Sequence, residues 1–178
     1  KKKYEIVENL DKAAIKDVKM LLSYDDDEIG SCMTTNYICI PKGLSVRQAM
    51  SELVRQAGTN DNISTIYVLD ESLKFAGAID LKDLIIARKH DVLDDIIVRS
   101  YPSVTDHEKI DDCMEKIMDY SEDSIPVLSQ DGHMLGVITS EDIVEIVDNE
   151  MGEDYAKLAG LTAEEDLKVS TAKKKKKR

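Results

Sequence analysis

The side chains best suited to chemistry in this chain are carboxylates, and they gather near its C-terminal end. No Lys or Arg interrupts them before Lys157, and the seven are Glu141, Asp142, Glu145, Asp148, Glu150, Glu153 and Asp154. Carboxylate oxygens are the ligands that hard cations prefer, and Mg²⁺ is usually held by one or two of them while it keeps several waters. The stretch is therefore a candidate divalent-cation site, and the alternative is an acidic surface exposed to solvent.

The spacing of apolar residues predicts that these carboxylates lie on a helix. One stripe recurs every three or four positions and consists of Val144, Val147, Met151, Tyr155 and Leu158. At 3.6 residues per turn, Asp142, Glu145 and Glu153 fall on the opposite face. Like charges at i,i+4 spacing destabilise a helix by a few tenths of a kcal/mol per pair. Such a face is either fully solvated or neutralised by a cation.

The elements that would position this helix come from an internal repeat. Residues 75–85 (FAGAIDLKDLI) resemble residues 134–144 (MLGVITSEDIV), at an offset of 59 positions. Upstream, residues 46–50 match residues 110–114 at an offset of 64. The difference in offset falls in the loop 57–62, which reads as a plain connection. Half of this repeat has too little core to stand alone, so the two copies are expected to pack on each other.

Each copy predicts the same order of elements. A short extended piece comes first (37–40; 103–104), then a helix (45–56; 108–120) and two short strands (65–69 with 74–79; 124–128 with 134–138). Each copy closes with a helix whose first residue is a good N-cap, Asp80 or Thr139, followed three positions later by an acid, Asp83 or Asp142. A further helix is predicted over Tyr4–Leu22.

Composition excludes several classes of function. The net charge is −12, and without the six basic residues 173–178 it is −18, from 18 Lys and Arg against 36 Asp and Glu. An acidic body repels nucleic acid, so no nucleic-acid partner is expected. No run of 18 apolar residues occurs, so no residue here is expected to cross a bilayer. The three histidines lack ligand-like spacing and are predicted to lie at the surface, and no catalytic motif indicates an enzyme.

The two strand-to-helix junctions resemble those of the tandem CBS-domain, or Bateman, module. The matching residues are Gly77-x-Ile-Asp80-x-x-Asp83 and Gly136-x-Ile-Thr139-x-x-Asp142. The family's form has Thr where the first copy has Asp80. The resemblance implies an α+β fold: a tandem CBS-domain pair with an N-terminal helical segment and a C-terminal connecting helix. The two CBS domains would span residues 23–87 and 88–147.

The flanks extend the resemblance to the cytosolic region of MgtE-type magnesium transporters. The lead into the pair, Leu21-Leu-Ser-Tyr24 and then Gly30-x-x-Met33-Thr34, and the acidic helix that leaves it are similar to that family. Residues 1–22 would then be the tail of a truncated helical domain, and residues 148–168 the "plug" helix that leads to the transmembrane pore. The basic tail 169–178 does not fit the family and is either an expression remnant or a membrane-proximal stretch.

The resemblance implies a Mg²⁺ sensor rather than an enzyme. The chain would be a homodimer at the cytoplasmic face of the cell membrane, attached to the pore of its parent protein, and Mg²⁺ would favour a compact, closed state. The carboxylates that match the family's metal-binding positions are Asp111, Asp142, Glu145, Glu150, Glu153 and Asp154. The sequence departs from the family at Lys109 and Ser121, where acids are expected.

An adenine nucleotide, ATP or AMP, is the alternative ligand. In many CBS pairs the Thr and Asp of the junction motif hold a ribose, and here the corresponding residues are Thr139 with Asp142 and Asp80 with Asp83. Asp80 suits this role poorly, because its charge would repel phosphates. The structural alternative is that Asp80 and Thr139 serve only as helix N-caps, worth about 1 kcal/mol each.

Overall fold

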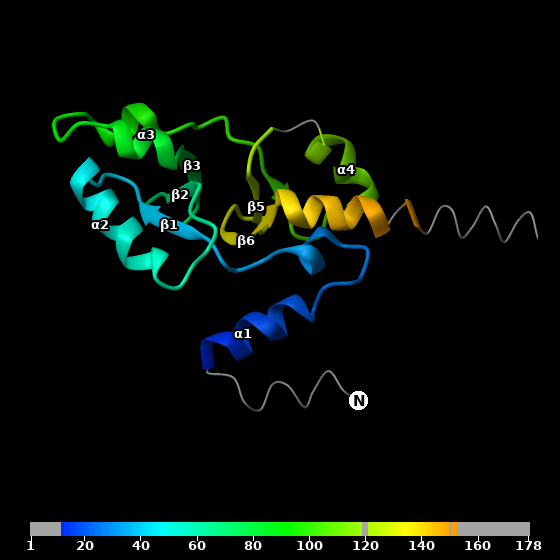
Figure 1. Ribbon diagram of the computed structural model, residues 1–178. Coiled ribbons are helices and arrows are strands. Elements are labelled where there is room, and N and C mark those ends of the chain that lie inside the picture. The colour runs from blue at the N-terminus through cyan, green and yellow to red at the C-terminus, as the bar shows by residue number, and fades with distance from the viewer. Residues whose placement is uncertain (1–11, 119–120, 150, 153–178) are drawn as a thin grey trace, which may run out of the picture. The chain divides into compact units, whose positions relative to one another are not determined.

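The computed structural model describes residues 12–118, 121–149 and 151–152 of the chain (Figure 1). They fall into two compact units that divide between Asp142 and Ile143. The first unit contains two copies of one arrangement of helices and strands, so the predicted internal repeat is present and the α+β class is confirmed.

The two copies share one order of elements. The chain begins with α1 (Lys12–Leu21), and the first copy then consists of η2 (Ile29–Cys32), β1 (Ile38–Pro41), α2 (Val46–Ala57), β2 (Thr65–Leu69), β3 (Phe75–Asp80) and α3 (Leu81–Ile86). The second copy consists of η3 (Leu93–Ile96), β4 (Val104–Thr105), α4 (Ile110–Met118), β5 (Ser124–Leu128) and β6 (Met134–Thr139). A C-terminal helix begins at residue 140 and is described over 140–149 and 151–152. The bounds predicted for the strands and for α2 differ from these by at most one residue, and the predicted start of α4 differs by two. The predicted end of that helix, at residue 120, lies outside the described residues.

Each copy builds a three-stranded sheet with the same pairing. In the first, β2 pairs in parallel with β1 and antiparallel with β3; in the second, β5 pairs likewise with β4 and β6. The register shifts at equivalent points, between Val68 and Leu69 and between Val127 and Leu128. The hairpin turns match too, because Leu73 (φ 61°) holds the left-handed conformation that Gly132 (φ 87°) holds in the second copy.

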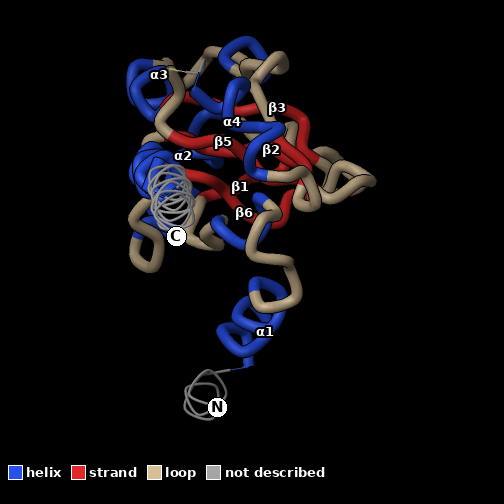
Figure 2. Tube along the Cα trace, turned by 90° about the vertical axis from the view of Figure 1, so that its right-hand side faces the viewer, coloured by secondary structure: helices blue, strands red, loops and turns tan. Residues whose placement is uncertain are grey.

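The strands lie in the middle of the first unit, as Figure 2 shows. One face of the first sheet packs under the helices of its own copy, in a core that includes Ile38, Ile66 and Ile79 with Ala49 and Leu53 of α2 and Leu84 of α3. The other face contacts the second sheet through the buried residues Tyr67, Ala78 and Val137. The rings of Tyr37 and Tyr101 meet Tyr67 edge-on, each with 6.1 Å between ring centroids. The copies therefore share a buried apolar interface, which is why neither needs to be stable alone.

The copies also exchange short pieces of chain. The segment before the first sheet reaches β6, where the N–H groups of Thr34 and Val137 each donate to the other's carbonyl over 2.9 Å. The segment before the second sheet reaches β3, where Ala78 and Val98 make the equivalent pair over 3.1 and 2.8 Å. Each exchanged segment supplies backbone partners to a strand of the other copy, so the two copies fold as one body.

The glycines of the repeated junction motif make this exchange possible. A Cβ on Gly136 would lie 2.8 Å from both the Thr34 carbonyl oxygen and the Met33 sulfur. A Cβ on Gly77 would lie 2.7 Å from the Val98 carbonyl oxygen, at a φ of +152° that side chains rarely adopt. The glycine in each copy is thus explained by the close approach of the other copy's backbone.

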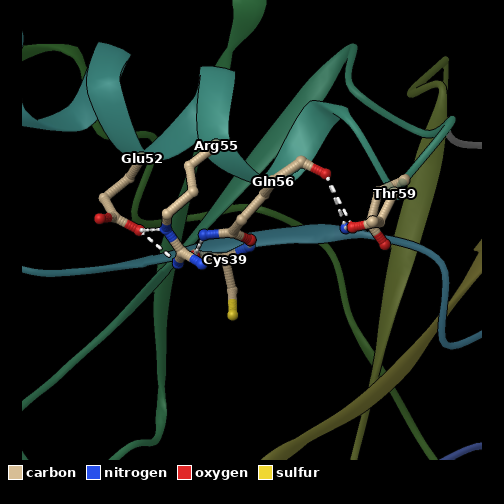
Figure 3. A network of polar contacts seen from close by, with 6 residues as sticks. Cys39, Glu52, Arg55, Gln56 and Thr59 are labelled. Carbon is tan, nitrogen blue, oxygen red and sulfur yellow. Dashed lines mark hydrogen bonds and ion pairs between the residues drawn. The ribbon is translucent and has the colours of Figure 1, made fainter.

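A side chain closes the free edge of β1. Figure 3 shows Gln56 of α2 beside Cys39: its amide nitrogen donates to the Cys39 carbonyl over 2.8 Å, and its amide oxygen accepts from the Cys39 N–H over 3.2 Å. The amide therefore takes the place of a neighbouring strand and protects an edge that could pair with another chain. The neighbouring residue Arg55 pairs with Glu52, three positions earlier in α2, over 2.6 Å at the surface.

Parts of the predicted N- and C-terminal helices lie outside the described residues. For the helix predicted over Tyr4–Leu22, the structure describes α1 and no residue before position 12. For the connecting helix predicted over 148–168, only residues 148–149 and 151–152 are described, and they are helical.

Candidate functional site

A cavity of about 410 Å³ opens in the first unit where the two copies meet. Three elements form it: β2 and β5 where they begin, and β6 where it ends. The lining residues are Asp61, Asn62, Ser64, Thr65, Asp123, Ser124, Thr139, Ser140 and Glu141. The volume is in the range of small-molecule sites. Five of these side chains carry hydroxyls and three are carboxylates, so the cavity offers hydrogen bonds in a negative field.

The hydroxyl and amide of Thr139, at the edge of this cavity, are held by Asp142. The Thr139 N–H donates to Oδ2 of Asp142 over 2.8 Å, and the Thr139 hydroxyl donates to the same oxygen over 2.7 Å. The amide of Asp142 donates back to the Thr139 hydroxyl over 3.2 Å. Together these bonds form a capping box that begins the C-terminal helix. Asp142 itself does not line the cavity, and only its Oδ1 is left for another partner.

The matching pair in the first copy is arranged differently. Asp80 is exposed, and its Oδ1 accepts a hydrogen bond from the N–H of Lys82 over 2.7 Å, which caps the six-residue helix α3. Asp83 is half-buried within that helix. Of the four residues predicted to contact a ribose, the structure therefore places only Thr139 at the cavity.

An aromatic cluster is connected to the cavity through Ser124. The Tyr101 hydroxyl donates to the Ser124 carbonyl over 2.7 Å, and the Tyr67 hydroxyl shares a hydrogen bond with the Ser124 side chain. Burial raises the pKa of Tyr101 to about 12 and that of Tyr67 further still, so both phenols stay neutral at physiological pH. They fix the start of β5, and with it the cavity wall, without adding charge.

The predicted metal ligands are only partly described. Asp111, in the first turn of α4, and Glu145, on the C-terminal helix, are both exposed. Glu150, Glu153 and Asp154 lie outside the described residues. Within the described part of the chain, no group of three or more His, Cys, Asp or Glu side chains is arranged to hold a metal ion.

Lys109 and Ser121, which stand where acids were expected, differ in their surroundings. The ammonium of Lys109 pairs with Asp27 over 2.7 Å, so a lysine ties α4 to the segment before η2 at the position where an acid was expected. Ser121 is exposed. The pattern of acids included the cavity residue Glu141 but missed the other two cavity carboxylates, because Asp61 sits in a loop that reads as a plain connection and Asp123 precedes a strand.

Comparison with known proteins identifies the repeat. The CBS domain family matches residues 28–90 and 93–149. The chain is 36% identical over 149 residues to the magnesium transporter MgtE of Enterococcus faecalis, across 84% of this chain and 33% of that protein. It also resembles two solved structures. One is the soluble part of a magnesium transporter, at 33% identity and a TM-score of 0.76 over 81% of this chain and 56% of that one. The other is the cytosolic domain of the Mg²⁺ channel MgtE in complex with ATP, at 27% identity and a TM-score of 0.74 over 80% and 57%.

The extent of these matches defines what is shared. The chain spans about a third of the length of the curated MgtE relatives it matches. Across the residues that the structure describes, no helix combines the length and the apolar character needed to span a membrane. The shared part is the repeat with its flanks: the chain belongs to the CBS-domain family, as a tandem CBS pair homologous to the cytosolic region of MgtE magnesium transporters.

Proposed function

We propose that this chain is the Mg²⁺-sensing regulatory region of a magnesium transporter or channel, and that bound Mg²⁺ favours a compact, closed state. The observation that carries the proposal is the set of exposed carboxylates on the C-terminal helix, in a chain homologous to MgtE. Glu145 and Asp148 are exposed, and neither forms an ion pair with another described residue. The proposed Mg²⁺ ligands are Asp111, Asp142, Glu145, Glu150, Glu153 and Asp154.

Repulsion between carboxylates would supply the switch. Two unit charges ~4 Å apart at an effective dielectric near 20 repel by about 4 kcal/mol. Several such pairs are enough to hold acidic elements apart when no cation is present. A bridging Mg²⁺ turns the repulsion into attraction. In a parent protein with a pore, at the cytoplasmic face of the membrane, the compact state would limit further Mg²⁺ entry. The role is regulatory rather than catalytic.

A homodimer is part of this proposal. The helices α2 and α3 present apolar side chains to solvent, with Val54 67%, Ile85 60% and Ile86 65% exposed. A depression of about 420 Å³ lies between these helices, lined by Met50 and Leu84 among others. A second copy burying this surface would gain about 25 cal/mol for each Å² of apolar area removed from water. Sedimentation should show a dimer for the native chain, and a monomer for Ile85→Glu.

Binding of an adenine nucleotide is the second candidate function. The cavity beside Thr139 favours it by its size and its hydroxyls, and an MgtE cytosolic domain with ATP is among the similar structures. The carboxylates of Asp61, Asp123 and Glu141 would repel a bare polyphosphate. The cavity therefore favours a nucleoside, or a nucleotide whose phosphates carry Mg²⁺.

Thermal unfolding of the whole chain tests the first function against the second. A ligand that binds only the folded state raises the unfolding temperature by mass action. Millimolar MgCl₂ alone should raise it more than NaCl of matched ionic strength, because screening acts on all exposed charges alike. Equal shifts from the two salts would mean that the carboxylates form only a solvated acidic surface. A shift that needs ATP or AMP would favour nucleotide binding.

A further inference from the structure

The segment that leads into the first copy is attached to the second copy. We call residues 24–30 the lead-in segment; it lies against residues 106–110, which run from the end of β4 to the first residue of α4. Three backbone N–H groups donate across this contact, each over 2.9 Å: Ile29 to Glu108, Gly30 to Asp106 and Ile110 to Asp27. A Cβ on Gly30 would lie 2.9 Å from the Asp106 carbonyl oxygen, so the two backbones approach closely. This contact joins the chain between α1 and the first sheet to the second copy.

A histidine lies between two carboxylates at this contact. The Nδ1 atom of His107 is 3.0 Å from Oε1 of Glu28, and its Nε2 atom is 3.6 Å from Oδ2 of Asp106. Its ring lies 5.3 Å from that of Tyr24, whose hydroxyl donates to the same Asp106 oxygen over 3.0 Å. A neutral imidazole carries one N–H and an imidazolium carries two. Only the charged ring can offer a proton to both carboxylates.

The groups around His107 favour that charge. Glu28 and Asp106 face its two nitrogens, Asp25 adds a further negative charge, and the nearby Lys109 is already paired with Asp27. The hydrogen bond to Glu28, followed by the charge of Asp106, raises the pKa of His107 above the ordinary value of 6.5.

Two carboxylates at this contact each have one buried oxygen that lacks a donor among the described residues. Asp106 is 6% exposed, and its second oxygen, Oδ1, has no hydrogen-bond partner among the described residues. One buried oxygen of Glu108 likewise has no hydrogen-bond partner among the described residues. A buried charge without enough partners is costly, so Asp106 depends on the few donors that face it. Tyr24, whose pKa is raised to about 12 by burial and by Asp106, remains a neutral donor throughout the physiological range.

We propose that the lead-in segment and residues 106–110 form a proton-dependent latch, in which protonated His107 ties Glu28 to Asp106 and holds the lead-in segment on the second copy. The latch would make the attachment of the preceding helix sensitive to pH, and it stands independently of any Mg²⁺ site. Glu28 is exposed only in part and is itself held by the Asp25 N–H, which donates to its Oε2 over 2.9 Å.

The direction of the pH dependence follows from the two shifts. Because the folded-state pKa of His107 is raised, its contribution is fully present below 6.5 and is lost as pH rises through the raised value. The pKa of Glu28 is lowered, chiefly by the Asp25 N–H and then by His107, so its contribution is present above 4.5 and is lost as pH falls through the lowered value. The latch should therefore be closed in mildly acidic solution and open in alkaline solution.

Two measurements on the whole chain test the latch. The first is NMR titration of the histidine rings, in which His107 should titrate above 6.5 and Glu28→Gln should lower its pKa. The second is hydrogen exchange at the amides of Ile29, Gly30 and Ile110, corrected for the intrinsic pH dependence. The protection of these three amides should fall as His107 loses its proton. The amides of Thr34 and Val98, which pair with strands of the other copy, should keep their protection.

Matched variants decide the outcome. His107→Gln should remove the pH dependence of protection, whereas His133→Gln, at a histidine beside Asp131 in a hairpin turn, should leave it unchanged. A His107 pKa at or below 6.5 would overturn the proposal, and so would a His107→Gln chain whose protection still changes with pH as the native chain's does. Should that variant fail to fold, the titration of the native chain and of Glu28→Gln still decides.

Discussion

Oδ2 of Asp142 accepts both the N–H and the hydroxyl of Thr139, over 2.8 and 2.7 Å. This pair stands where the cavity ends and the C-terminal helix begins, so one residue contributes to the cap of the acidic helix and borders the candidate nucleotide site. Asp142 is also among the proposed Mg²⁺ ligands. Because one of its oxygens is already occupied, a substitution at Asp142 changes the helix cap as well as the acidic charge.

Removing the cap should destabilise the fold. Thr139→Ala removes the hydroxyl that accepts from the Asp142 N–H and should lower the free energy of unfolding by about 1 kcal/mol. Ser45→Ala should have a similar effect, since Ser45 forms the capping box of α2 with Gln48. Urea unfolding measures both, and Ser72→Ala, at an exposed turn position, is the control. If Thr139→Ala were as stable as that control, the cap would contribute nothing.

The exchange of segments between copies makes Gly77 and Gly136 hard to replace. Gly136→Ala forces a methyl group against the Thr34 carbonyl, and Gly77→Ala adds backbone strain to a similar clash with Val98. Overpacking of this kind costs about 1–3 kcal/mol, and Gly77→Ala should be the worse of the two. Gly58→Ala is the matched control, because a Cβ there meets nothing within 4 Å. If chemical denaturation gave equal stability for the three variants, the close approach of the swapped segments to Gly77 and Gly136 would be contradicted.

The left-handed conformation at position 73 should make glycine more stable there than alanine. Leu73 is 65% exposed and holds φ at 61°, so it carries left-handed strain with little burial to offset it. Leu73→Gly should be about 1 kcal/mol more stable than Leu73→Ala, which keeps the strain and loses the same side chain. Thermal and urea unfolding compare the pair. An alanine variant as stable as the glycine variant would show that the turn is unstrained.

The charge of the cavity should govern which nucleotide binds. Replacing Asp61, Asp123 and Glu141 with their amides removes three negative charges from the lining and should tighten the binding of ATP without Mg²⁺. Adenosine, which is uncharged, should be affected far less. Calorimetry with both ligands measures the difference, and Glu71→Gln, in the exposed turn after β2, is the control. Unchanged ATP affinity in the triple variant would mean that ATP does not bind in this cavity.

Local signals made much of the fold predictable. The N-caps at Asp80 and Thr139 and the helical spacing of apolar residues each act over a few residues, and the repeat let one copy check the other. The left-handed position in the first hairpin was hidden, because leucine stands where the second copy has Gly132. The C-terminal carboxylates could be named from sequence, but whether they act as ligands stays a prediction.

Long-range pairing could not be predicted in the same way. Nothing near Thr34 or Val98 signals that each completes a strand of the other copy, since such pairing depends on the packing of the whole unit. The same holds for Asp106, whose burial comes from the lead-in segment, and for Gln56, whose role appears only when α2 lies beside β1. His107 is exposed, as predicted, yet one of its nitrogens faces Asp106, the residue before it, and the other faces Glu28, 79 positions away in the chain.

Hydrogen exchange along the C-terminal helix tests the central claim most directly. Amides of residues 141–149 are compared in EDTA, in MgCl₂ and in NaCl of matched ionic strength, for the native chain and for a variant with Asp111→Asn, Glu145→Gln, Glu153→Gln and Asp154→Asn. The variant keeps Asp142, so the cap remains. A second variant, Glu71→Gln with Asp95→Asn, removes charge elsewhere on the surface. We expect Mg²⁺ to slow exchange in the native and control chains, NaCl to do much less, and the four-site variant to lose most of the response. A four-site variant that responds to Mg²⁺ as the native chain does would contradict the proposed sensing role of these carboxylates.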